Sequence, residues 1–201
     1  MSEVLYMDAC VREERSRTRK LAERFLRGYE RVHPEDKIIR LNLTRMELTP
    51  HTPELLRERE RLWRAGRLDH PLFDLAWQFA AADKLVIAAP FWDLGFPALL
   101  KIYLERISVN KISFGYGGDG RLLGLCKAER LLYITTRGGD YSQPDTAPLE
   151  MGARYVEALC RMYGIGEFRL LCAEGLDDVR NDPEQLMARA MERADALAQL
   201  F

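Results

Sequence analysis

Two loop segments combine residue types that could hold a flat, phosphate-bearing ring. Residues 89–97 read Ala-Pro-Phe-Trp-Asp-Leu-Gly-Phe-Pro, and residues 135–141 read Thr-Thr-Arg-Gly-Gly-Asp-Tyr. Each segment follows a short apolar run, at 84–88 and at 131–134, that is typical of a buried parallel strand. Open α/β sheets bind their ligands just beyond the carboxyl ends of such strands. A turn rich in proline and aromatic residues beside a double-glycine turn makes a flavin the first candidate ligand.

The first of these loops has the features of a rigid ring-binding turn. Pro90 fixes the backbone, and Phe91 and Trp92 supply apolar surface. We expect the peptide N–H groups of residues 93–95 to be left free by the turn, and to face the edge of a ring. Flavin N5 and the pyrimidine edge need such groups in fixed positions. A Pro-Gly turn with buried aromatic side chains would also explain Pro90, but it explains a Trp beside an Asp less well.

The double-glycine loop suits close approach of a ligand to the backbone. Gly138 and Gly139 lack Cβ atoms, so a ligand could lie against their peptides. Thr136 can donate a hydroxyl hydrogen bond, and Tyr141 can cover a ring. The alternative for this loop is a plain tight turn.

A third segment, residues 10–18, precedes a predicted helix and favours a phosphate. The first N–H groups of a helix have no internal partner, and its dipole attracts anions. Ser16 and Thr18 could add hydroxyl donors. Ser16 could equally serve only as the cap of the helix. Glu13 and Glu14 oppose an anion unless they face water.

The elements that must position these loops alternate between strand and helix along the whole chain. Leu21, Phe25 and Tyr29 recur at a spacing of four, which places them on one face of a helix. The apolar pattern predicts strands at about 4–7, 37–43, 84–88, 131–135 and 168–173, and helices at about 16–32, 54–67, 72–82, 97–108, 148–163 and 183–200. Residues 110–125 are glycine-rich and are expected to be irregular.

This alternation, without a hairpin signal, predicts the α/β class. We expect one flavodoxin-like domain over residues 1–201, a three-layer α/β/α sandwich with a five-stranded parallel sheet in the order 2-1-3-4-5. In that order strands 1, 3 and 4 are neighbours. The three loops described above would therefore converge on one edge of the sheet.

Composition excludes several other classes of protein. Hydrophobic residues make up 47% of the chain, enough for a core without disulfides or metals. A net charge of −1, with acids and bases interspersed as in residues 57–61, argues against binding to nucleic acid. The four Cys and three His are scattered without metal-ligand spacing. Residues 1–7 do not read as a signal peptide, and no apolar run could span a membrane, so we expect a cytoplasmic protein.

The same segments resemble a known family. Residues 88–103, Ala-Ala-Pro-Phe-Trp-Asp-Leu and then Pro-Ala-Leu-Leu-Lys-Ile-Tyr from 97, resemble the flavin loop and following helix of FMN-dependent NADH azoreductases. These are NAD(P)H quinone reductases of flavodoxin-like fold whose loop typically reads Pro-Met-Tyr-Asn-Phe. Residues 134–139 resemble the family's Ser-Arg-Gly-Gly loop, and residues 16–18 stand where it has a Ser-x-Ser phosphate loop. The resemblance covers nearly the whole chain.

The resemblance implies an FMN-dependent oxidoreductase and a set of cofactor-binding residues. NADH or NADPH would be the donor, and two electrons would pass through flavin N5 to a quinone, an azo compound or a related acceptor by a ping-pong mechanism. No catalytic acid or base would be required. It also implies a homodimer with each flavin near the interface. The residues implied are Ser16, Arg17 and Thr18 for the phosphate, Pro90, Phe91, Trp92, Asp93 and Leu94 for the ring and its N5 side, and Thr136, Arg137, Gly138, Gly139 and Tyr141 for the pyrimidine side.

Three residues depart from the family pattern. Ala9 stands where the family usually has a serine, so one hydroxyl near the phosphate is lost. Trp92 replaces a tyrosine, which reshapes the substrate face. Asp93 replaces an asparagine, and a carboxylate there should disfavour anionic reduced flavin and lower its reduction potential.

Two other functions compete with this interpretation. A low-molecular-weight tyrosine phosphatase would use Cys10 as nucleophile, Arg17-Thr18 in its anion loop and Asp182 as general acid. Its motif has five residues between Cys and Arg, whereas six separate Cys10 from Arg17, and Asp182 is more simply a helix cap. A non-enzymatic flavodoxin-like electron-transfer or binding protein is the other alternative. The charged segment 54–67 could be a dimer arm, a lid over the flavin or a solvated helix, and we favour the arm.

Overall fold

The computed structural model describes residues 1–201, and a five-stranded parallel sheet forms its centre. The strands are β1 (Glu3–Asp8), β2 (Lys37–Asn42), β3 (Lys84–Ala88), β6 (Arg130–Thr136) and β7 (Glu167–Ala173). They pair in the order β2-β1-β3-β6-β7, and every pairing is parallel. Since β6 and β7 are the fourth and fifth strands of this sheet, the predicted order 2-1-3-4-5 is confirmed.

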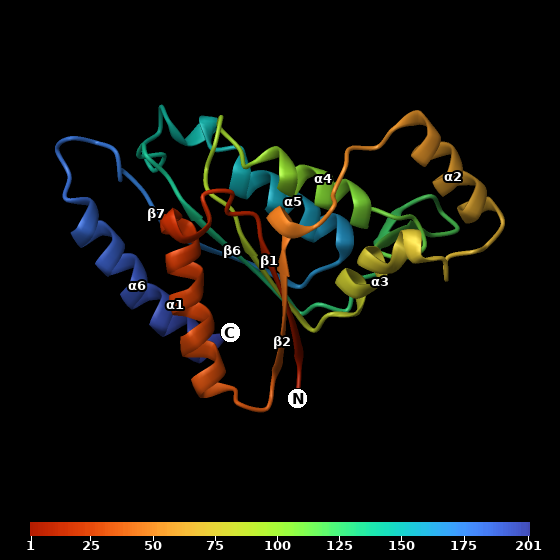
Figure 1. Ribbon diagram of the computed structural model, residues 1–201, viewed down its shortest axis with the longest axis horizontal. Helices are drawn as coiled ribbons and strands as arrows, with labels where there is room; N and C mark the ends of the chain where they lie inside the picture. The colour runs from red at the N-terminus through yellow and green to blue at the C-terminus, as the bar shows by residue number, and fades with distance from the viewer.

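Alternating strand residues build a separate core on each side of the sheet. Val4 and Tyr6 of β1 pack with α1 (Arg17–Val32) and α6 (Pro183–Leu200). Leu5 and Met7 face the other way, as the two-residue period of a strand requires. That second core includes α3 (Asp74–Ala81), α4 (Ala98–Ile107) and α5 (Gly152–Tyr163). Figure 1 shows these two groups of helices on opposite sides of the sheet.

Local sequence signals set where the helices begin and end. Ser16 Oγ accepts the N–H of Arg19 at the start of α1. Thr52 caps α2 (Pro53–Arg64) in the same way, and the Asp182 carboxylate accepts two N–H groups at the start of α6. Gly164 ends α5 in a left-handed conformation with φ of 76°. The helices predicted at 16–32, 54–67 and 183–200 are therefore confirmed to within a few residues.

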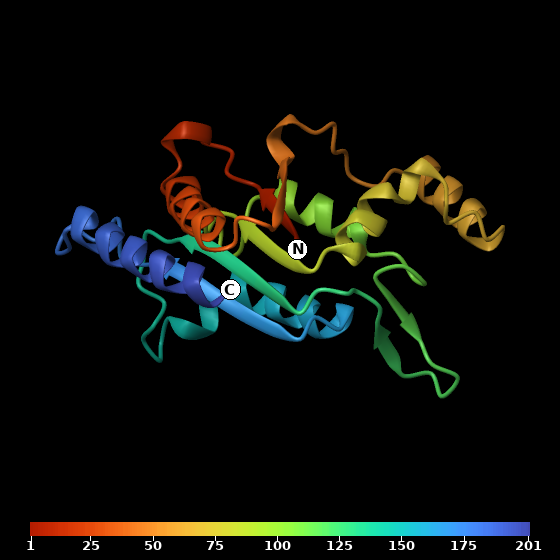
Figure 2. The ribbon, with the colours of Figure 1, turned by 90° about the horizontal axis from the view of Figure 1, so that it is seen from below.

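The expectation that residues 110–125 are irregular is wrong. They contain an antiparallel pair, β4 (Phe114–Tyr116) and β5 (Leu122–Gly124), whose connection includes Gly120 at φ of 78°. Strands of three residues are too short for an alternating apolar pattern to reveal them. Figure 2 shows that this hairpin and α2 both project from the end of the molecule opposite α6.

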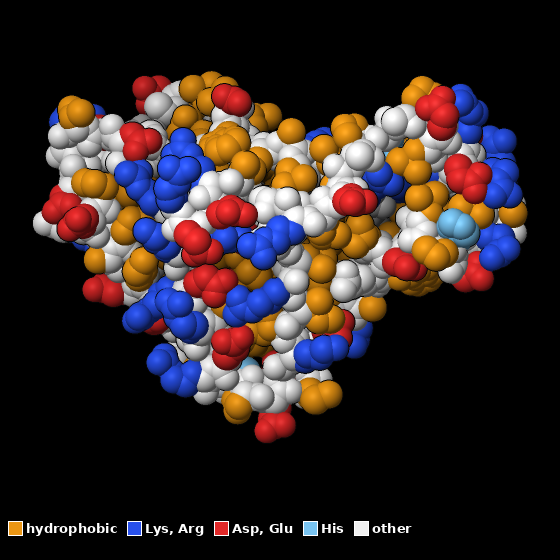
Figure 3. Space-filling view, viewed as in Figure 1, with side chains coloured by type: hydrophobic (Ala, Val, Ile, Leu, Met, Phe, Trp, Pro, Cys, Tyr) orange, Lys and Arg blue, Asp and Glu red, His pale blue; other side chains and the backbone are white.

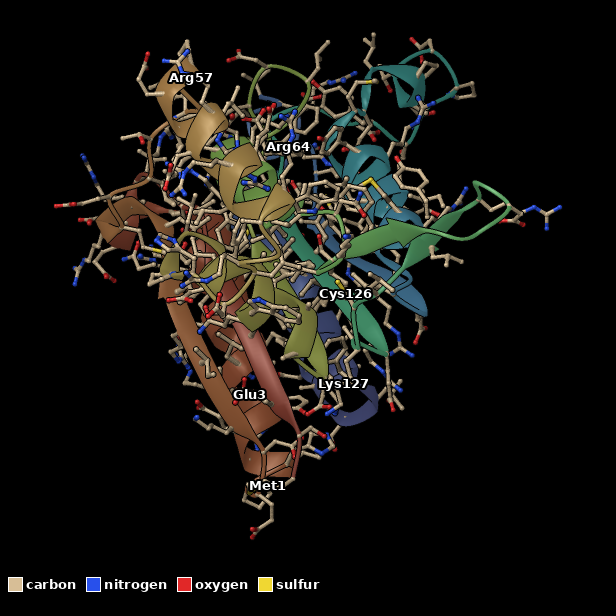
Figure 4. The ribbon with its side chains drawn as sticks, turned by 90° about the vertical axis from the view of Figure 1, so that its right-hand side faces the viewer. Met1, Glu3, Arg57, Arg64, Cys126 and Lys127 are labelled. Carbon is tan, nitrogen blue, oxygen red and sulfur yellow. The ribbon has the colours of Figure 1, made fainter.

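Charged residues of both signs are mixed on the surface. At the amino-terminal edge of the sheet, Asp83 joins the start of β1 to the segment before β6. Figure 3 shows Lys, Arg, Asp and Glu interspersed over α1 and β2. The Asp83 carboxylate accepts hydrogen bonds from the Glu3 N–H and the Lys127 ammonium, whose residues are labelled in Figure 4. None of the helices is both long and apolar enough to cross a membrane.

Candidate functional site

The carboxyl ends of β1, β3 and β6 bring three loops to one edge of the sheet. Backbone hydrogen bonds join the loops in order: the Ala9 N–H donates to Ala88 O at 2.9 Å, and the Phe91 N–H donates to Thr136 O at 3.1 Å. A cavity of about 400 Å³ opens among them. It is lined by Arg12, Arg15, Ser16, Arg17, Thr18, Pro90, Phe91, Trp92, Thr136, Arg137, Gly138, Leu176 and Asp177. The predicted convergence of the loops is thus confirmed.

One end of the cavity has the properties of an anion site. The N–H groups of Arg17 and Thr18 precede the first intrahelical bonds of α1, so they remain available. Ser16 caps the helix by accepting a hydrogen bond, which leaves its own hydroxyl hydrogen free to donate. Both interpretations of Ser16 are therefore compatible. Lys and Arg side chains gather near this end of α1 in Figure 3.

The segment before α1 adds positive charge that sequence reasoning missed. Arg12 and Arg15 line the cavity, and neither makes an ion pair. Glu13 and Glu14 are exposed and do not line it, so they meet the condition under which an anion is favoured. The signal available in the sequence was the recurrence of Arg at 12, 15 and 17, beside a helix N-terminus.

Thr18 and Thr136 join the anion end of the cavity to the end of β6. Their hydroxyl oxygens lie 2.7 Å apart, and both side chains are buried. Because one hydroxyl donates to the other, the pair retains a single hydroxyl hydrogen to offer a ligand. These two predicted residues therefore act together rather than as independent donors.

Phe91 forms the aromatic part of the cavity wall and is held from two sides. The Arg137 guanidinium lies 5.4 Å from the centre of its ring, and the Tyr141 ring centre lies 4.6 Å away. Tyr141 does not line the cavity itself. It contacts Phe91 from outside the lining, and its predicted role in covering a ligand ring stays a prediction.

Arg137 is a buried ion-pair residue at the base of the wall. Its side chain is 4% exposed, and its guanidinium lies 3.0 Å from the Glu150 carboxylate and 2.5 Å from that of Glu174. Burial opposes the charge, but Cys172, Glu150 and Glu174 together more than offset it and raise the pKa of Arg137. Its Nε has no partner within the protein. Arg137 therefore supports the loop through its two carboxylate partners.

Residues 92–95 form a tight turn with two left-handed residues. Asp93 has φ of 49° and Leu94 has φ of 64°, and Trp92 and Gly95 exchange backbone hydrogen bonds of 3.2 and 2.8 Å. The expected free N–H of Gly95 is therefore wrong, because it donates to Trp92 O. The N–H groups of Asp93 and Leu94 have no acceptor in the protein. A leucine in this conformation is strained, and such strain concentrates at functional sites.

The double-glycine loop contacts a neighbouring loop rather than open space. A Cβ on Gly138 would lie 2.4 Å from the Asp177 carboxylate, so a larger residue there would displace the Asp177 side chain. Gly139, Asp93 and Leu94 do not line the cavity, and Asp93 and Leu94 are exposed. Leu176 and Asp177, from the loop after β7, were not predicted. That loop reaches the site because β7 is the neighbour of β6.

Cys10 has none of the properties of a phosphatase nucleophile. Its side chain is fully buried in the core beside α1, and its thiol donates a long hydrogen bond to Ala88 O. Burial and the nearby Asp8 carboxylate raise the pKa of the Cys10 thiol, which keeps it protonated. Asp182 is occupied as the cap of α6.

The chain is similar to known proteins over nearly its whole length. The model of a family described by its flavodoxin-like fold matches residues 2–198. The chain is 39% identical to FMN-dependent NADH:quinone oxidoreductase 2 of Clostridium acetobutylicum and 35% identical to the corresponding enzyme of Coprothermobacter proteolyticus, each over 100% of both chains. Its fold is similar to that of an azoreductase from Bacillus anthracis, with a TM-score of 0.90 at 26% identity over 100% of both chains. The chain therefore belongs to the flavodoxin-like family that contains the FMN-dependent NADH:quinone oxidoreductases and azoreductases.

Proposed function

We propose that this chain is an FMN-dependent NAD(P)H oxidoreductase that reduces quinones, azo compounds or related acceptors. The observation that carries the proposal is the cavity at the joined ends of β1, β3 and β6, which has an anion-binding helix N-terminus at one end and an aromatic wall beside it. Its volume of about 400 Å³ falls within the range of small-molecule sites. The names of the two curated relatives support the choice of FMN and NADH.

The residues of the cavity fit the two chemically different parts of FMN. The N–H groups of Arg17 and Thr18 and the unpaired guanidinium groups of Arg12 and Arg15 would hold the phosphate. The apolar surface of Pro90, Phe91 and Trp92 would contact the ring. Residues 93 and 94 lie outside the lining, next to Trp92, and their free N–H groups would face the N5 edge of the ring.

The protein's contribution is to bind, orient and shield. When bound, FMN would supply the redox chemistry of a ping-pong two-electron transfer from NAD(P)H to the acceptor. Trp92 is 36% exposed at the mouth of the cavity, where it would shape the face that donor and acceptor share. No side chain of the site has to act as an acid or base for this chemistry.

We propose further that residues 1–201 act as one domain of a homodimer, with the site near the interface. The support is an exposed apolar surface beside the cavity, called here the site-side patch. It consists of Trp92, Leu94, Leu149, Met151 and Tyr155. The Met151 N–H donates to Leu94 O at 3.0 Å, so the 92–95 turn and the start of α5 present one continuous surface. Exposed apolar patches of this kind mark contact surfaces.

The test of the proposed function is the visible spectrum of the purified protein after incubation with FMN and removal of free flavin. We expect retained flavin absorption that bleaches when NADH is added without oxygen. Retained absorption that NADH does not bleach would instead support an electron-transfer protein. A protein that retains no FMN, and binds none in titration, would contradict the proposal.

A further inference from the structure

The Arg17–Asp177 ion pair lies across the anion end of the cavity. Arg17 Nη1 and Asp177 Oδ1 are 2.8 Å apart, although the two residues are 160 positions apart in the chain. Arg17 opens α1, and Asp177 belongs to the loop after β7, so the pair bridges two sides of the same cavity. We infer that the Asp177 carboxylate competes with the phosphate of the ligand for Arg17, so that the phosphate must displace it to bind. This inference rests on the proposed FMN function.

The backbone of Asp177 is held firmly against the double-glycine loop. The Asp177 N–H donates to Gly138 O at 3.0 Å, and the Leu176 N–H donates to Arg137 O at 3.2 Å. The second carboxylate oxygen lies over Gly138, at 2.4 Å from where a Cβ would be. Because these contacts fix the backbone, the carboxylate leaves Arg17 only by rotation of its own side chain.

The charges around the cavity predict how Asp177 affects the binding of a phosphate. Arg12, Arg15 and Arg17 line the cavity, and of these only Arg17 makes an ion pair. A phosphate dianion that reaches Arg17 therefore meets one carboxylate and loses part of the attraction of the arginines. Removing that negative charge should strengthen the binding of a phosphate-bearing flavin. It should not affect a flavin that lacks the phosphate.

The test compares the dissociation constants of FMN and riboflavin, measured by flavin fluorescence, for the wild type and Asp177→Asn. The substitution keeps the shape of the side chain and removes its charge. Because Asp177 is 72% exposed, the effect of its charge is screened by solvent. We expect the dissociation constant of FMN to fall by about two- to fivefold, and that of riboflavin to stay unchanged.

Two further variants separate the ion pair from general charge effects. Asp178→Asn removes the same charge one residue away, from a carboxylate paired with Arg180, and should leave FMN affinity unchanged. In an Arg17→Gln background, which should itself weaken FMN binding, Asp177→Asn should give a smaller gain than in the wild type.

Each outcome decides one of the two claims. An unchanged or weaker FMN affinity in Asp177→Asn would overturn the inference while leaving the proposed function intact, and so would an equal gain in Asp178→Asn. A gain for riboflavin equal to that for FMN would overturn it as well. If the wild type binds no FMN, the proposed function fails and the competition with it.

Discussion

At the scale of single residues, Arg137 stabilises the fold through a buried ion pair, although it lies in a loop predicted to bind the ligand. Its guanidinium is buried between the Glu150 and Glu174 carboxylates and lies against Phe91. Removing the cation leaves two carboxylates facing each other in a poorly solvated place. We expect Arg137→Met to lower the free energy of unfolding by about 3 kcal/mol, measured by urea denaturation. Arg17→Met, at an exposed ion pair, should change it by less than about 1 kcal/mol. Equal losses would contradict this assignment.

Asp93 tests the electrostatics of the proposed ring edge. Its carboxylate stands in a turn whose free N–H groups would face flavin N5, so its negative charge should disfavour the reduced, anionic ring. A single exposed charge near the ring should change the free energy of flavin reduction by about 0.5–1 kcal/mol. We therefore expect Asp93→Asn to raise the two-electron potential of bound FMN by about 10–20 mV. The measurement is a redox titration with a reference dye, and an unchanged or lower potential would refute this role.

How far single residues can be predicted depends on whether their role is local. Ser16, Pro90 and Phe91 follow from motifs in their own segments, and the structure places all three at the cavity. Asp177 could not be foreseen, because its contacts with Arg17 and Gly138 exist only after the chain has folded. For Tyr141 a local motif suggested a ligand contact; the structure shows its contact with Phe91, and the ligand contact stays a prediction.

At the scale of elements, the β4–β5 hairpin is attached to α5 through two glycines that touch along their backbones. A Cβ on Gly124 would lie 2.0 Å from the Gly164 nitrogen, so no larger residue fits. We expect Gly124→Ala to reduce stability by about 1–3 kcal/mol, and to increase hydrogen exchange in the hairpin first. Gly118→Ala, where a Cβ would meet nothing within 4 Å, is the matched control. Similar stability losses in both variants would rule out the backbone contact as the cause.

Asp83 links elements at the amino-terminal edge of the sheet and gives the protein a pH dependence. Hydrogen bonds from the Lys127 ammonium and the Glu3 N–H hold the pKa of Asp83 below its usual value of 3.8. A lowered folded-state pKa stabilises the protein above the unfolded pKa, and this contribution disappears as the pH falls through the folded value. Asp83→Asn should therefore cost about 1 kcal/mol at neutral pH. As the pH falls below about 4, the free energies of unfolding of the wild type and the variant, measured in urea, should converge. A constant difference between them would contradict the linkage.

The elements also show why most of the fold was predictable and the hairpin was not. The central strands β1, β3 and β6 are buried apolar runs, and the helices carry caps such as Thr52 and Gly164, so these signals are local and strong. The pairing of β4 with β5 depends on three-residue strands and on packing against the end of α5. Neither leaves a periodic pattern in the sequence.

At the scale of the whole molecule, the charged helix α2 has one face exposed to solvent and another packed against the rest of the protein. Its outer face pairs Arg57 with Glu54 and Arg61 with Glu58, which is the pattern of a solvated surface. Its inner face is docked, because the Trp63 indole donates to Asn110 O and the Arg59 guanidinium to Ser108 O. Figure 4 shows Arg57 and Arg64 on this projecting helix, and its use as a dimer arm stays a prediction.

The homodimer itself makes the site-side patch the most informative surface to change. Met151 is the most exposed residue of this patch, at 51%, and a glutamate there would place a charge in the proposed interface. We expect light scattering to show a dimeric wild type and a monomeric Met151→Glu variant, with weaker FMN binding if the partner helps to enclose the flavin. Leu123→Glu, at a residue 48% exposed on the β4–β5 hairpin, should remain dimeric. A monomeric wild type would refute the homodimer. Dissociation caused only by Leu123→Glu would place the interface on the hairpin, and Trp92 would then contact donor and acceptor without help from a partner subunit.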